Sequence, residues 1–158
     1  MDFYPTNVTL HIIFAGIWIS FIIIEFVLKS KIQNSGNEPK KNLFIYQYIK
    51  FTKIFVIAGS IGITITGVLL VIFNSHYGFF NMTGNHWLAT KQILFVLILF
   101  NTVVNIYPSI KKFENNFNND NNNFNGNKLL NKIFKTNRLI IILVIINFLF
   151  AITHKFYT

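Results

Sequence analysis

The sequence has no cysteine and few acidic residues, and both shortages restrict its chemistry. Five of its 158 residues are Asp or Glu, fourteen are Lys or Arg, and charged residues make up only 12%. Without cysteine the chain can form no disulfide, no thiolate metal site and no covalent c-type haem linkage, and it has no Cys nucleophile. It also has no P-loop, dinucleotide-binding loop, serine triad or two-carboxylate glycosidase motif. Soluble hydrolase chemistry is therefore unsupported.

The chain has instead long blocks of apolar sequence. Hydrophobic residues make up 53% of it, more than a soluble domain of this size carries. The apolar segments lie at about 8–28, 51–73, 87–106 and 139–153. A helix over the first segment would be roughly 31 Å long, which matches the hydrocarbon core of a bilayer. We predict an all-α fold, an integral membrane four-helix bundle that forms one domain over residues 1–158.

Polar segments separate these apolar blocks. Ser35-Gly36-Asn37, followed by Pro39, predicts a turn before a helix at 42–50. The asparagine-rich stretch at about 113–127 is low in complexity, and we expect it to be a flexible linker. Residues 1–7 lack a positively charged signal-peptide region, so we expect the first apolar helix to be retained in the mature protein.

The basic residues predict the orientation of the chain. Twelve of the fourteen flank the first and third loops: Lys29, Lys31, Lys40, Lys41, Lys50, Lys53, Lys111, Lys112, Lys128, Lys132, Lys135 and Arg138. Because basic loops stay on the cytoplasmic side, both termini and the loop at 74–86 should be extracytoplasmic. We expect a bacterial inner (plasma) membrane location, with the lipid bilayer as a partner. The formal charge of +9 is thus a topology signal, and no nucleic-acid partner is expected.

This orientation places every histidine in one outer layer. His11, His76, His86 and His154 fall there, with Lys91 about one turn into the third apolar segment. Imidazole is the usual axial ligand of b-type haem, and two helices can hold the iron between a histidine pair. His11 and His154 are the candidate pair. A hydrogen-bonded or water-facing histidine is the alternative.

Copper or zinc is a competing use of the same histidines, because imidazole suits both metals. His76 and His86 would then join His11 and His154 as ligands. The chain has no HxxxH pair and no Met-rich tract, so nothing in the sequence determines the ligand geometry.

Three further features leave alternatives open. The second apolar segment carries small residues near one side, Gly59, Gly62 and Thr66 with Ala58 and Ile65, which favours close helix packing over a groove for a flat macrocycle. At the inner end of the first segment, Glu25 either pairs with Lys29 four residues on or takes up protons. Lys91 either reaches the outer interface or pairs with a buried carboxylate such as a haem propionate.

Several short motifs resemble one membrane superfamily. His11 is followed by Trp18 in LHIIFAGIW, the third segment begins WLATK at 87–91, and YIKFTKIFVIAGSIGITITGVLL lies between them. These stretches are similar to the first three helices of the superfamily that includes HemJ-type protoporphyrinogen oxidases and the CopD copper-resistance domain. Where HemJ proteins have Asn-Glu-Val-Pro, this chain has Asn-Arg-Leu-Ile at 137–140 and keeps only the asparagine.

The resemblance implies a four-helix membrane protein that binds b-type haem near the outer face. His11 would be the ligand, with Trp18 and Lys91 at the cofactor site and His154 as the further candidate. The expected function is electron transfer or porphyrin redox chemistry, and any enzyme activity would be that of a protoporphyrinogen oxidase-type oxidoreductase. The chain could act as a homo-oligomer or as a subunit of a larger membrane complex. Copper handling or transport, and a structural subunit without cofactor, are the alternatives.

Overall fold

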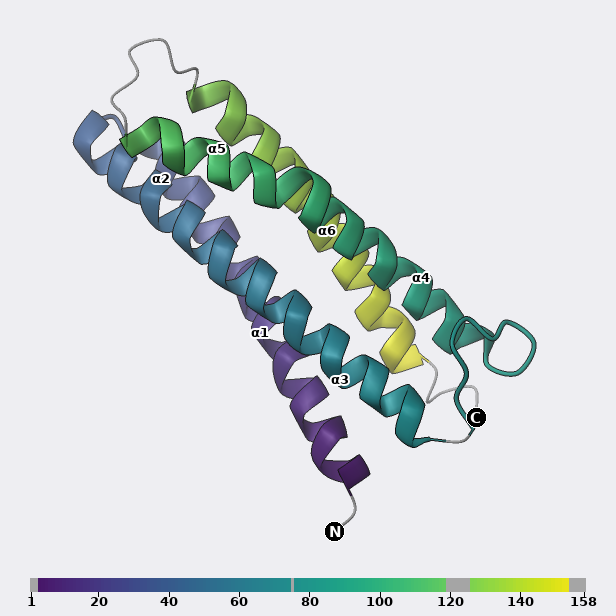
Figure 1. Ribbon diagram of the computed structural model, residues 1–158. Coiled ribbons are helices and arrows are strands. Elements are labelled where there is room, and N and C mark those ends of the chain that lie inside the picture. Colours follow the sequence, from purple (N-terminus) through teal and green to yellow (C-terminus); the bar gives the residue numbers. More distant parts are fainter. Residues whose placement is uncertain (1–2, 75, 119–125, 154–158) are drawn as a thin grey trace. The chain divides into compact units, whose positions relative to one another are not determined.

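The computed structural model describes residues 3–74, 76–118 and 126–153 (Figure 1). Within these ranges the chain forms six α-helices and two π-helical segments and contains no strand. In chain order they are α1 (Phe3–Asn34), α2 (Glu38–Thr52), η1 (Lys53–Ala58), α3 (Gly59–Phe73), α4 (His86–Asn101), η2 (Thr102–Ile106), α5 (Tyr107–Asn118) and α6 (Gly126–Thr153). The all-α prediction is confirmed.

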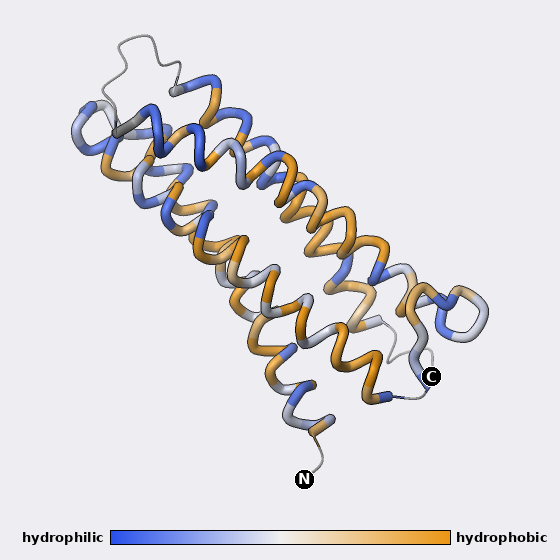
Figure 2. The backbone as a smooth tube through the Cα atoms, viewed as in Figure 1, coloured by the Kyte–Doolittle hydropathy of each residue, from blue (hydrophilic) through white to orange (hydrophobic). Residues whose placement is uncertain are grey.

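Among the described residues, four continuous helical stretches are long and apolar enough to cross a membrane. They span Phe3–Asn34, Glu38–Phe73, His86–Asn116 and Gly126–Thr153. Each contains one predicted apolar segment, and Figure 2 shows the long hydrophobic stretches along these helices. The helices run beyond the predicted segments, because their polar ends continue the same backbone hydrogen bonding. Residues 113–118 and 126–127 of the predicted linker are helical, and 119–125 lie outside the described residues.

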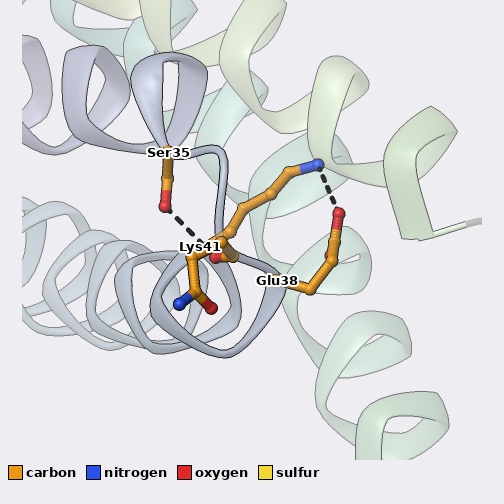
Figure 3. A network of polar contacts seen from close by, with 4 residues as sticks. Ser35, Glu38 and Lys41 are labelled. Atoms are coloured by element: carbon orange, nitrogen blue, oxygen red, sulfur yellow. Dashed lines mark hydrogen bonds and ion pairs between the residues drawn. The ribbon is translucent and has the colours of Figure 1, made fainter.

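The turn between α1 and α2 forms where it was predicted (Figure 3). Asn37 is extended, with φ −109° and ψ 116°, and the Ser35 hydroxyl donates to its carbonyl oxygen at 3.3 Å. On the new helix, Lys41 Nζ lies 3.6 Å from Glu38 Oε1. Pro39 stands in the first turn of α2, where its missing N–H has no partner to lose, so the helix begins before residue 42.

The π-helical segments η1 and η2 each join two α-helices into one long helix. Near each of them a side-chain hydroxyl donates to the carbonyl oxygen four residues earlier, from Ser60 to Val56 and from Thr102 to Ile98. Such bonds compete with the regular backbone bonds and accompany widened turns. Apolar patterning alone does not predict these segments.

The chain divides into two compact units, residues 1–75 and residues 76–158. In the first unit α1 packs against both α2 and α3. In the second unit α6 packs against both α4 and α5. Each unit is described by itself below.

Candidate functional site

In the first unit, aromatic side chains of α1 lie against the glycines of α3. Gly59 and Gly62 are both buried. A Cβ atom added to Gly59 would overlap the indole of Trp18, and one added to Gly62 would overlap the ring of Phe14. The small-residue face is therefore a helix-packing surface, as the sequence favoured, and its groove is filled by α1.

Two residues predicted to share that face lie elsewhere. Ala58 is exposed at the end of η1, and the side chain of Ile65 is 56% exposed. The π-helical turns of η1 alter the helical register there, so the three- and four-residue spacing of a regular helix does not hold across Ala58. The face that α1 covers includes Gly59, Gly62 and Thr66.

A polar cluster joins α1 to α3 next to these glycines. His11 Nδ1 lies 2.8 Å from Thr66 Oγ1. One turn earlier on α1, Asn7 Nδ2 donates to the Thr66 carbonyl oxygen at 3.1 Å. The Thr66 hydroxyl itself donates to the Gly62 carbonyl oxygen at 2.8 Å. We refer to Asn7, His11, Gly62 and Thr66 as the His11 cluster.

These bonds orient the His11 ring. A threonine hydroxyl has one proton, and that of Thr66 points to the Gly62 carbonyl, so the hydroxyl accepts from His11. In this geometry Nδ1 of His11 donates to the Thr66 hydroxyl. In metal-ligating histidines one ring nitrogen is likewise held by a neighbouring group.

The space beside the ring depends on a third glycine. A Cβ atom added to Gly67 would lie 3.5 Å from His11 Cε1, in ordinary van der Waals contact. A larger side chain at this position would crowd the imidazole. The neighbouring α3 residues thus hold His11 by one hydrogen bond and leave room for the ring itself.

At the other end of the apolar part of α1, Glu25 is buried, with 4% of its surface exposed. The Tyr48 hydroxyl of α2 donates to Glu25 Oε1 at 3.4 Å, and Tyr48 is fully buried. Lys29, the predicted partner, lies close enough to attract the same carboxylate electrostatically. Glu25 Oε2 is buried and has no hydrogen-bond partner among the described residues. The tyrosine was not anticipated from the sequence.

In the second unit, Lys91 lies beside an aromatic pair. Its Nζ is 5.7 Å from the centre of the Trp87 ring, within range of a cation–π interaction. Trp87 in turn meets Tyr77 edge to face, with ring centres 6.0 Å apart. Lys91 is half-buried in this position.

The loop before α4 is held by amide side chains. Asn81 Oδ1 accepts from the backbone N–H groups of Thr83 and Gly84 at 3.2 and 3.0 Å. The backbone N–H of Phe80 donates to Gln92 Oε1 of α4 at 2.6 Å. These bonds hold the loop against the start of α4.

The other candidate ligands are placed less favourably. His76 and His86 are exposed, and Asn85 Nδ2 donates to the carbonyl oxygen of His76 rather than engaging its ring. Among the described residues, no three His, Cys, Asp or Glu side chains come together as a metal-binding group would. His154 lies outside the described residues, and with it the predicted pair with His11.

Comparison of the chain with models of known protein families, with curated proteins and with solved structures gave no match. Membership of the HemJ and CopD superfamily stays a prediction.

Sequence reasoning missed Asn7 and Thr66 as partners on either side of the helix contact. Asn7 precedes His11 by four residues and Gly62 precedes Thr66 by four, so each pair lies on one face of its helix. That spacing was the available signal. It became informative only once the two faces were known to meet.

Proposed function

We propose that this chain is a four-helix membrane protein that binds b-type haem through His11 and serves electron transfer or porphyrin redox chemistry. The observation that supports it is the His11 cluster, in which the Thr66 hydroxyl holds Nδ1 of the imidazole ring, as a neighbouring group holds the ring of a metal-ligating histidine. When bound, haem supplies reversible one-electron chemistry at its iron.

The residues of the first unit fit one axial ligand. His11 is half-buried among apolar residues of α1, which is an expensive position for a histidine without a role. Trp18 and Phe14 fill the groove of α3, so the proposed site does not use that groove, and Trp18 would support His11 by fixing the helix contact. His154 as a further ligand and Lys91 as a partner of a propionate stay predictions from the sequence.

The visible spectrum of the purified protein, produced with haem precursor, tests the proposal. We expect a Soret band that His11→Ala abolishes. Thr66→Val should weaken haem affinity about tenfold, because it removes the group that orients the ring. Thr64→Val is the matched control, since within the described ranges the Thr64 hydroxyl bonds to the Ser60 carbonyl of its own helix, at 2.6 Å, and not to α1. A missing Soret band, or one unchanged by His11→Ala, would overturn the proposal.

The same preparation separates the other functions. Bound copper without a Soret band, lost on His76→Ala and His86→Ala, would favour copper handling. Stable co-purifying partners without chromophore or metal would favour a structural subunit. Size analysis would show whether the chain is a homo-oligomer.

We further propose that the basic loops are cytoplasmic and both termini extracytoplasmic, in a bacterial inner membrane. Because the chain has no cysteine, single cysteines can be introduced without background. A membrane-impermeant maleimide should label Thr83→Cys in intact cells and label Lys40→Cys only after permeabilisation. The reverse labelling would contradict this orientation.

A further inference from the structure

The first thirteen residues of α6 have two opposite faces. The buried side chains are Leu130, Ile133, Phe134 and Asn137. The exposed basic side chains are Lys128, Lys132, Lys135 and Arg138. At about 100° per residue these two sets fall on opposite sides of the helix. We refer to the second set as the basic stripe.

The helix that packs against α6 at this end adds more positive charge. On α5, Ile110 and Phe113 are buried while Lys111 and Lys112 are exposed. In the described parts of α5 and of the first half of α6, Glu114 is the single acidic residue. The described residues of this end thus carry several basic side chains and one acidic side chain.

The stripe lies where lipid headgroups would be. The apolar part of α6 begins at Leu139, directly after Arg138. Lys135 and Lys132 are about 5 and 9 Å further along the helix axis. The headgroup region of one leaflet is about 5–7 Å thick, and long lysine side chains reach several ångströms along the helix. Arg138, Lys135 and Lys132 can therefore all meet phosphate oxygens.

We infer that the basic stripe of α6 binds anionic phospholipid headgroups of the adjacent leaflet. The opposite face of this segment is buried against its own unit, so the basic side chains all lie on the exposed face of the helix. The Arg138 guanidinium can bond a phosphate with two parallel N–H groups, and the lysines add point charges. Each cation near a charged membrane surface strengthens binding about fivefold. This inference does not depend on haem binding.

Spin-labelled lipids test it in phosphatidylcholine vesicles that contain the full-length protein. We expect labelled phosphatidylglycerol to associate at least about fivefold more strongly than labelled phosphatidylcholine. The triple variant Lys132→Gln, Lys135→Gln, Arg138→Gln should bring this ratio close to one. The charge-preserving variant Lys132→Arg, Lys135→Arg, Arg138→Lys should keep it, which shows that charge and not folding is measured.

A control on the first unit is Lys40→Gln, Lys41→Gln, which should leave the ratio nearly unchanged because these lysines lie ten or more residues before the apolar segment at 51–73, about 15 Å along a helix. An equal loss in this control would overturn the inference, because net charge alone would then explain the preference. Equal binding of the two lipids by the unmodified protein would overturn it as well. The inference would also be wrong if the stripe variant abolished the binding of soluble inorganic polyphosphate but kept the lipid preference.

Discussion

The two units use polar side chains in different ways. In the first, they cross between helices: Asn7 and His11 reach Thr66, and Tyr48 reaches Glu25. Hydroxyl groups of both units bond carbonyls one turn earlier on their own helix, as Ser60 does to Val56 in the first and Thr102 does to Ile98 in the second. The first unit adds to this shared pattern the polar contacts between its helices.

The difference follows from the size of the residues at each contact. Glycines on α3 let α1 come close, so a side chain as short as that of Thr66 reaches His11 across the interface. Among the described residues of the second unit no glycine is buried, and the buried side chains include Ile98, Ile106, Ile110, Ile133 and Ile140. Without a glycine at the contact, a hydroxyl as short as that of Thr102 reaches only the carbonyl of Ile98 on its own helix among the bonds described for it. Four substitutions, from the largest expected effect to the smallest, test this contrast.

Gly62→Ala should have the largest effect. Its new methyl group would overlap the Phe14 ring, and overpacking of this kind costs about 1–3 kcal/mol of unfolding free energy. Unfolding in a denaturing detergent titration measures it. Gly16→Ala on α1 is the control, because nothing lies within 4 Å of that position. If the two variants were equally stable, close packing would not define the first unit.

The bond between His11 and Thr66 should show as a coupling energy. A double-mutant cycle with His11→Leu and Thr66→Val should give about 0.6–1.7 kcal/mol, the range for hydrogen bonds between membrane helices. The same cycle with Thr64→Val should give a coupling near zero. If the coupling were no larger for Thr66 than for Thr64, the hydrogen bond between His11 and Thr66 would not stabilise the first unit.

Tyr48→Phe should have a smaller effect. The bond to Glu25 Oε1 is long, at 3.4 Å, so its loss should lower the unfolding free energy by about 0.5–1 kcal/mol. Tyr46→Phe on the exposed side of α2 should change it by less than about 0.5 kcal/mol. Equal effects for the two tyrosines would show that the buried hydroxyl does not join α1 to α2.

Thr102→Val in the second unit should have the smallest effect. The hydroxyl bonds within its own helix, and valine keeps the branched shape, so we expect a change within about 0.5 kcal/mol. The same titration measures it. A loss as large as the His11 and Thr66 coupling would mean that both units depend on polar side chains to the same degree.

The sequence predicted the four apolar helices and the turn at Ser35-Gly36-Asn37, because both depend on residues that are neighbours in the chain. It could not predict that Thr66 meets His11, since that contact depends on the axial register of two helices. The extension of α5 to Asn118 was missed because low complexity was taken as disorder.

The sequence by itself determined the chemistry that is possible: four long apolar helices, one histidine within the first of them, and no thiol. Hydropathy accumulates along the chain, so local composition is enough to predict it. Only the tertiary structure decided the surroundings of His11. The approach of α1 to the glycines of α3 put Nδ1 on the Thr66 hydroxyl and filled the small-residue groove with Phe14 and Trp18. These contacts between α1 and α3 depend on the axial register of the two helices to within a few ångströms, and no apolar pattern specifies that register.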